Sequence, residues 1–225
     1  MSTRALRYVV KPLLFAASLA PFGWLLWAGF HQTLGPNPLE TITHETGDWT
    51  LRFLLLTLTV TPLRALSGWN AVVRFRRMLG LFAFFYGSLH LTTYLWFDQF
   101  FSWSSILHDI PKRPFITMGF FAFCAMVPLA ATSTAGMIRR LGGRRWQALH
   151  RLVYAAAIAG AVHYWWLVKA DISRPRAYAS ALAALLALRI GVAVARKRRT
   201  GSARAATGVR PDRPSMPAAS PSGNQ

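Results

Sequence analysis

Cysteine and acidic residues are both scarce in this sequence of 225 residues. A single cysteine, Cys124, excludes a disulfide framework and any zinc or iron–sulfur site built on several thiolates. Asp and Glu number only seven, against 26 Lys and Arg, which gives a formal net charge of +19. That charge alone would suggest nucleic-acid binding, but 53% of the residues are hydrophobic and only 15% are charged. The composition therefore indicates a membrane protein and argues against a nucleic-acid partner.

Six apolar stretches are each long enough to cross a bilayer core, which takes about 20 residues of helix. Backbone groups in lipid must be paired within a helix or a closed barrel, and long runs that do not alternate exclude a barrel. The sequence therefore predicts an all-α fold, a polytopic membrane bundle of six transmembrane helices. We expect these helices near residues 12–30, 49–66, 78–97, 115–135, 147–168 and 177–195.

The first apolar stretch also resembles a cleavable signal peptide, because Arg4, Arg7 and Lys11 precede it and small residues follow at 17–20. It continues to Phe30, which is longer than the apolar region of a signal peptide, so we expect a retained helix.

Basic residues are distributed unevenly between the two sides of the predicted bundle. Residues 1–11, 64–77, 136–146 and the segment from 196 onward hold 18 of the 26 Lys and Arg, against five in the opposite loops. Positive loops stay in the cytoplasm, so both termini are predicted to be cytoplasmic. We expect a membrane domain over 1–198 and a disordered cytoplasmic tail over 199–225, which is rich in Ser, Pro, Ala, Gly and Arg.

Two histidines are predicted to lie deep in the membrane, where ionisable groups are costly and therefore candidates for function. His90 and His163 fall about 18 Å and 24 Å from the inner face at 1.5 Å per residue, so they share roughly one level. Imidazoles at one level on two helices could be the axial ligands of a heme. Each could instead bond to a neighbouring helix. We expect the histidines of the outer loops to be surface residues: His31, His44 and His108.

Two further residues are weaker candidates for cofactor contact. His150 is predicted near the inner face, where it could ligate a heme with a weak partner, contact a flavin or quinone, or cap its helix. Arg52 is predicted near the level of the heme propionates, and a guanidinium binds carboxylates well, although it could also extend to the interface.

Small and aromatic residues surround the paired histidines in the sequence. Small side chains would let a flat macrocycle approach the backbone, and aromatic ones could enclose it, although both also serve helix packing. The small residues are Gly87, Ala155, Ala156, Ala159 and Gly160, and the aromatic ones are Phe84, Phe85, Tyr86, Trp165 and Trp166.

Several separated motifs resemble one family, the heme-binding membrane subunit of the bacterial periplasmic protein-methionine-sulfoxide reductase system, within the ferric-reductase-like transmembrane superfamily. The resemblance covers about residues 5–198. The matching motifs are Thr46-Gly47-Asp48-Trp49, Arg76-Arg77-Met78-Leu79-Gly80-Leu81, Leu89-His90, Lys112-Arg113-Pro114-Phe115-Ile116-Thr117-Met118-Gly119, Thr132-Ser133 and Arg144-Arg145-Trp146-Gln147-Ala148-Leu149-His150-Arg151-Leu152-Val153-Tyr154.

The resemblance implies a b-type cytochrome of the inner membrane that passes electrons to a periplasmic molybdopterin subunit, which performs the reduction of methionine sulfoxide. It implies heme b and FMN as cofactors, and the quinol pool or a cytosolic flavin reductase as donor. It makes His90 and His163 the heme ligands and His150 a further heme-linked histidine. The broader superfamily has two histidines on each of two helices, whereas this chain has one, His90, on the third.

Two other functions remain open at the level of sequence. One is another quinone-linked cytochrome or a ferric reductase subunit. The other is a cofactor-free transporter or assembly scaffold, in which the histidines relay protons or bond between helices.

Overall fold

The computed structural model describes residues 3–206, and this part of the chain is helical, with no strand. The chain divides into a compact unit, Met1–Arg189, and a second unit, Ile190–Gln225. The longer helices are α2 (Lys11–Phe30), α3 (Pro38–Ser67), α4 (Val73–Thr93), α5 (Trp103–Lys112), α6 (Pro114–Ala131), α7 (Ala135–Leu149), α8 (Leu152–Leu167) and α9 (Ser173–Ala206). Short helical turns flank them at α1 (Thr3–Ala5), η1 (Leu6–Val10), η2 (Asn70–Val72) and η3 (Tyr94–Asp98).

The helix ends follow from local sequence. Asn37 caps α3 by accepting a hydrogen bond from the backbone N–H of Glu40, and Pro38 follows at the first helical position. Gly68 ends the same helix with φ at 68°, a left-handed conformation that glycine adopts without strain. Thr134 caps α7 in the same way as Asn37 caps α3.

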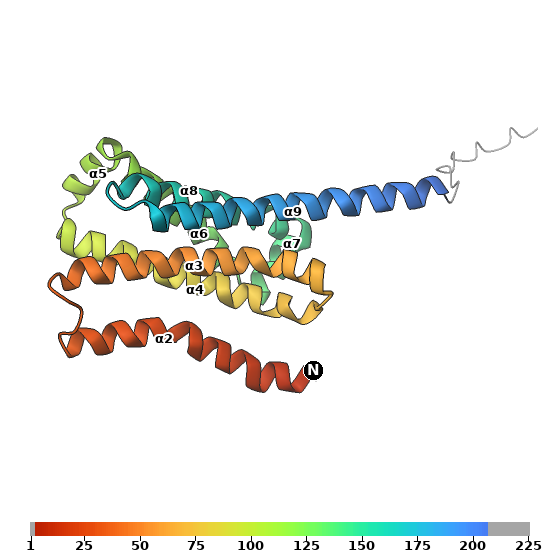
Figure 1. Ribbon diagram of the computed structural model, residues 1–225, viewed down its shortest axis with the longest axis horizontal. Helices are drawn as coiled ribbons and strands as arrows, with labels where there is room; N and C mark the ends of the chain where they lie inside the picture. Colours follow the sequence, from red (N-terminus) through yellow and green to blue (C-terminus); the bar gives the residue numbers. More distant parts are fainter. Residues whose placement is uncertain (1–2, 207–225) are drawn as a thin grey trace, which may run out of the picture. The chain divides into compact units, whose positions relative to one another are not determined.

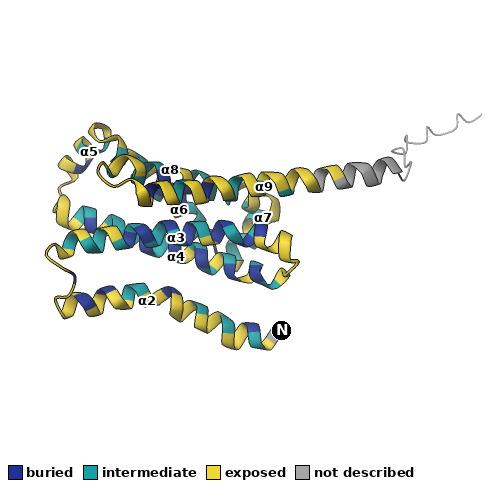
Figure 2. Ribbon diagram, in the orientation of Figure 1, coloured by how far each residue is buried: buried dark blue, intermediate teal, exposed yellow. Residues whose placement is uncertain are grey.

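Two helix pairs form the centre of the first unit: α3 packs along α4, and α6 packs along α8 (Figure 1). Phe53 of α3 stacks on both Phe82 and Tyr86 of α4, with ring centroids 5.5 and 5.4 Å apart. Tyr86 also links α4 to α2, because its hydroxyl donates a hydrogen bond to the Ser18 carbonyl oxygen and accepts one from the Phe22 N–H. Figure 2 shows that buried residues follow α3 and α4, whereas most of α2 is exposed. An apolar helix with so much exposed surface is typical of a membrane span.

Within residues 3–206, four helical segments are long and apolar enough to cross a membrane: Leu6–Phe30, Asn70–Asp98, Pro114–Ala131 and Ser173–Ala195. They correspond to four of the six predicted spans. The other two differ in particular ways. Helix α3 has 30 residues but is less apolar, because it carries Asp48, Arg52 and Arg64. Helix α8 is apolar but has only 16 residues, or about 24 Å.

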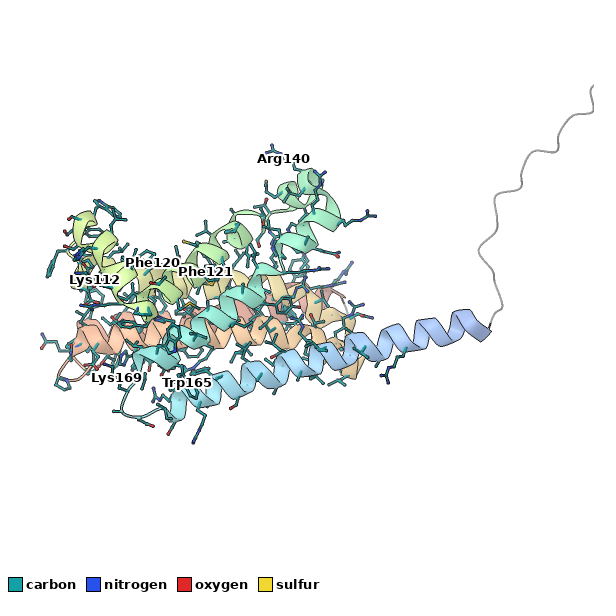
Figure 3. All side chains as sticks on the ribbon, turned by 90° about the horizontal axis from the view of Figure 1, so that it is seen from above. Lys112, Phe120, Phe121, Arg140, Trp165 and Lys169 are labelled. Atoms are coloured by element: carbon teal, nitrogen blue, oxygen red, sulfur yellow. The ribbon has the colours of Figure 1, made fainter. Side chains whose placement is uncertain are left out.

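The two ends of the bundle can be followed in Figure 3. Lys112 and Lys169, from predicted outer loops, lie at one end, and Arg140, from a predicted inner segment, lies at the other.

Three boundaries differ from the sequence analysis. The expected loop 136–146 is helix α7, because Arg, Leu and Met are good helix formers whether or not they carry charge; the helix is kinked at Gly142, where φ is 73°. The expected helix 147–168 is divided by a turn at His150 and Arg151. Helix α9 covers Ser173–Ala206 and so continues beyond the expected end of the last helix at 195, since extending a formed helix is easier than starting one. The rest of the expected tail, 207–225, lies outside the described residues.

Candidate cofactor site

A cavity of about 320 Å³ lies among α3, α4, α6 and α8. This volume is at the lower end of the range for small-molecule and cofactor pockets, about 300–1,000 Å³. Both His90 of α4 and His163 of α8 line it, together with mainly apolar side chains. The two histidines that the sequence placed at one level are therefore brought to one cavity.

The imidazoles of His90 and His163 face each other at short range. Their ring centroids are 6.0 Å apart and their planes are inclined by 77°. A metal–imidazole bond is about 2 Å long, so two rings on opposite sides of one ion have centres roughly 6 Å apart. Two imidazoles complete the coordination of an iron whose other four ligands come from a porphyrin. The spacing of this pair is suited to that arrangement.

Hydrogen bonds orient both rings through the same nitrogen. The Nδ1 atom of His90 lies 2.9 Å from the Thr43 carbonyl oxygen, and that of His163 lies 2.6 Å from the Phe115 carbonyl oxygen. A carbonyl oxygen can only accept, so each Nδ1 carries the proton. In a neutral imidazole this leaves Nε2 as a free electron pair, and such a carbonyl partner is the usual support of a metal-binding histidine.

Two glycines provide the space that the rings occupy. A Cβ atom added at Gly47 would lie 3.1 Å from the His90 ring, and one added at Gly119 would lie 2.9 Å from His163 Nδ1. Real Cβ contacts at 2.9 Å are essentially absent, so a side chain at Gly119 would displace the imidazole. Both glycines line the cavity. The residues present therefore fit a group held between the two histidines.

The walls of the cavity are partly those that the sequence indicated. Gly87 and Gly160 line it, as expected for small residues near a flat group. The aromatic lining residues are Phe115, Phe120 and Phe123 of α6, together with Tyr94 and Tyr164, and not the five aromatic residues named in the sequence analysis. Those residues have other roles or surroundings: Tyr86 joins α4 to α2, and Trp165 and Trp166 are 41% and 50% exposed.

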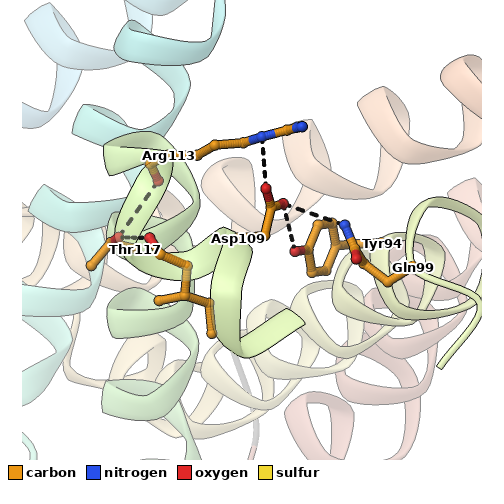
Figure 4. Close-up of polar contacts among 6 residues, drawn as sticks. Tyr94, Gln99, Asp109, Arg113 and Thr117 are labelled. Carbon is orange, nitrogen blue, oxygen red and sulfur yellow. Dashed lines mark hydrogen bonds and ion pairs between the residues drawn. The ribbon is translucent and has the colours of Figure 1, made fainter. Parts of the chain in front are cut away.

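A polar cluster includes several residues that line the cavity, and Figure 4 shows its contacts. Asp109 of α5 accepts hydrogen bonds from the Tyr94 hydroxyl at 3.1 Å and the Gln99 amide at 3.3 Å. Its other oxygen pairs with Arg113 Nε at 2.8 Å. Tyr94, Gln99 and Arg113 all line the cavity, so Asp109 holds three lining residues together. Sequence reasoning missed this cluster, which joins η3, α5 and the segment between them.

Asp48, not Arg52, is the charged residue of α3 that lines the cavity within the described part of the chain. The Arg52 guanidinium is engaged elsewhere: Nε donates to the Tyr178 hydroxyl at 2.9 Å, and Cζ lies 4.5 Å from the Trp49 ring centre. Its remaining contact is with Asp48, at 3.5 Å. The signal for Asp48 in the sequence was a carboxylate at the start of an apolar run.

His150 lies apart from the cavity, at the C-terminal end of α7. Its ring stacks on Trp146 with centroids 3.8 Å apart, and Nδ1 lies 3.0 Å from the Trp146 carbonyl oxygen. Its Nε2 is the one buried side-chain nitrogen or oxygen in residues 3–206 that has no hydrogen-bond partner. His31 and His108 are exposed, as expected. His44, also expected at the surface, is exposed but lines the cavity.

The chain is a helical membrane protein in which two opposed imidazoles share one cavity. This arrangement is typical of membrane bundles that bind a cofactor between facing helices. Residues 46–161 match the family described as ferric reductase like transmembrane component. The "protein-methionine-sulfoxide reductase heme-binding subunit MsrQ" of Herminiimonas arsenicoxydans is 55% identical over 81% of this chain and 84% of its own length. The proteins of the same name from Rhodospirillum rubrum and Bordetella pertussis are 53% and 50% identical, over 84% and 87% of this chain and 90% and 94% of theirs.

These matches cover more than half of the chain for the family and more than four fifths for the relatives. The chain belongs to the ferric-reductase-like transmembrane family, in its group of protein-methionine-sulfoxide reductase heme-binding subunits.

Proposed function

We propose that this chain is a heme-binding electron-transfer subunit that supplies electrons to a protein-methionine-sulfoxide reductase. The observation that carries the proposal is the His90–His163 pair, 6.0 Å apart in one cavity, in a chain whose relatives are named as heme-binding subunits. Reduction of methionine sulfoxide itself takes place in the partner subunit, which we expect to contain molybdopterin.

His90 and His163 would hold the iron through Nε2, with Thr43 and Phe115 fixing the rings through Nδ1. A heme bound there supplies a one-electron redox centre, and two imidazole ligands favour electron transfer over binding of an exogenous ligand. The mainly apolar lining, with Leu51 and Phe123 among it, would limit the contact of this centre with water. The chain thus contributes a fixed redox site inside an insulating layer.

For topology we propose six spans in the bacterial inner membrane, with both termini cytoplasmic. Helices α3 and α8 would be the two spans beyond the four apolar segments, because each packs along a helix that is one of those four. The unequal distribution of Lys and Arg supports the orientation. Residues 1–198 would form the membrane domain.

Other cofactor and donor assignments follow from the family and are proposed at the same level. FMN would be a second cofactor, and the quinol pool or a cytosolic flavin reductase would be the donor. His150 is proposed as a further cofactor-linked histidine because its buried Nε2 has no partner. Arg52 is proposed to bind the heme propionates, because a guanidinium pairs well with carboxylates.

The test is a pyridine hemochrome assay, with flavin quantification, on the protein purified in detergent. We expect a b-type spectrum and, after reconstitution with the molybdopterin subunit and a reductant, reduction of a methionine-sulfoxide substrate. A colourless protein would favour a transporter or scaffold. A heme protein that never co-purifies with, or reduces, a molybdopterin partner would favour another quinone-linked cytochrome or a ferric reductase subunit.

A further inference from the structure

Asp48 is a buried carboxylate at the candidate heme site. Its side chain is only 5% exposed, and it lines the cavity next to Gly47, the glycine that makes room for the His90 ring. A buried charge is costly unless it is well paired, and an apolar residue would fill the same space more cheaply. The residue therefore calls for an explanation beyond packing.

The two ion pairs of Asp48 are long. Arg52 and Arg174 both approach the same atom, Oδ2, and each lies at 3.5 Å, a long distance for a charge-assisted hydrogen bond. Asp48 also accepts a hydrogen bond from the Tyr164 hydroxyl, and Tyr178 lies near enough to interact with its charge. The carboxylate is thus surrounded by two cations and two phenols from α3, α8 and α9.

The two arginine side chains are far more exposed to solvent than the carboxylate of Asp48. The side chains of Arg52 and Arg174 are 36% and 69% exposed, so water and salt screen their charges. The carboxylate of Asp48, at 5% exposed, acts across the poorly screening interior. A group in the cavity therefore experiences the negative charge more strongly than the two positive ones.

We propose that Asp48 sets the reduction potential of the heme by stabilising its oxidised state. The inference rests on the proposed function. Oxidation adds one positive charge to the group in the cavity, and a buried negative charge beside it favours that state and lowers the potential. Arg174, at the exposed side, moderates the effect.

The experiment is a redox titration of the purified holoprotein and four variants, followed by the heme absorption band. Asp48→Asn keeps the shape and removes the charge, so we expect a higher potential, by about tenfold in the oxidised-to-reduced ratio or 59 mV for one electron. Arg174→Gln should lower the potential by a smaller amount. The controls remove charges of the same sign on the same helices. Glu40→Gln on α3 and Arg176→Gln on α9 lie at exposed positions and form no ion pair with Asp48 within the described residues, so they should leave the potential unchanged.

The outcomes separate the two levels of inference. A wild-type protein without heme overturns the proposed function. A heme protein whose potential is the same in Asp48→Asn as in Glu40→Gln overturns the role of Asp48 alone. Should Asp48→Asn fail to retain heme, the comparison of Arg174→Gln with Arg176→Gln decides, because equal potentials in those two variants contradict the proposal.

Discussion

The His90–His163 pair and His150 are two histidine sites built in different ways. In the pair, each Nδ1 is held by a carbonyl from another helix, 47 or 48 residues away in the chain, and the rings face each other across a cavity. At His150, Nδ1 is held by Trp146, four residues earlier on the same helix. A hydrogen bond from another helix fixes an imidazole relative to the rest of the bundle, so two such rings can face one cavity. A hydrogen bond within the same helix fixes the ring only relative to that helix.

His31 shows what the local arrangement means by itself. This exposed histidine ends α2, stacks on Trp27 at 4.5 Å, and places Nδ1 2.8 Å from the Trp27 carbonyl oxygen. His150 repeats these three features at the end of α7. What distinguishes His150 is burial of an Nε2 that has no partner. The stacked arrangement is thus a way to end a helix, and only the buried nitrogen supports a role in cofactor binding.

The largest expected difference between the His90–His163 pair and His150 is in heme content. We expect His90→Ala and His163→Ala each to abolish nearly all of the heme, since a single imidazole cannot hold the iron from both sides. His150→Ala should retain the heme of the pair, as should His31→Ala, its matched control. The measurement is heme per protein by pyridine hemochrome. If His150→Ala lost half the heme while His31→Ala lost none, His150 would hold a second heme and the distinction drawn here would be wrong.

How much of this could be predicted depends on the range of each contact. Counting 1.5 Å per residue from the inner face placed His90 and His163 at one level, because depth in a membrane is a local property of a helix. The carbonyls of Thr43 and Phe115 could not be predicted in this way, since they depend on which helices pack together. The same is true of Gly119, whose role depends on a ring 44 positions along the chain.

Charge was a poorer guide than depth. The sequence favours Arg52 as a partner of the propionates, which stays a prediction; in the structure its guanidinium contacts Tyr178 and Asp48, and Asp48 lines the cavity. The sequence predicts a loop for the basic residues around Arg140, but they form helix α7. Net charge predicts the side of the membrane on which a segment lies. It does not predict secondary structure or the pairing of individual groups.

Glycine variants sharpen the comparison by disturbing one ring at a time. Gly119→Ala places a Cβ atom 2.9 Å from His163 Nδ1, which should displace the ring from the Phe115 carbonyl oxygen. Loss of a hydrogen bond that supports a metal-binding histidine typically weakens metal binding about 10- to 100-fold. Gly47→Ala, at 3.1 Å from the His90 ring, should have a smaller effect. Gly143→Ala on α7 is the control, because nothing lies within 4 Å of its added Cβ. Heme titration into the apoprotein measures all three. Equal affinities would show that the rings do not need this space.

The cavity-lining residues held by Asp109 should depend on its part-buried polar contacts. Asp109→Ala leaves the Tyr94 hydroxyl and the Gln99 amide without their acceptor, which we expect to cost about 1–3 kcal/mol of unfolding free energy. Asp98→Ala removes the same charge from an exposed position that also lines the cavity, and should cost much less. Unfolding in SDS titrations compares the two. Similar losses would mean that charge, not the hydrogen-bond cluster, stabilises this end.

The smallest expected effect concerns the local site. Trp146→Phe keeps an aromatic ring under His150 but removes the hydrogen bond from Nε1 to the Thr132 carbonyl oxygen, 3.0 Å long. A hydrogen bond of this kind contributes about 0.5–1.5 kcal/mol net, so the free energy of unfolding in SDS should decrease by about that amount. Heme content should stay that of the wild type, because this bond does not touch the cavity. Trp24→Phe, at a 49% exposed position on α2, is the control. Loss of heme in Trp146→Phe but not in Trp24→Phe would show that the surroundings of His150 affect heme binding at the His90–His163 pair.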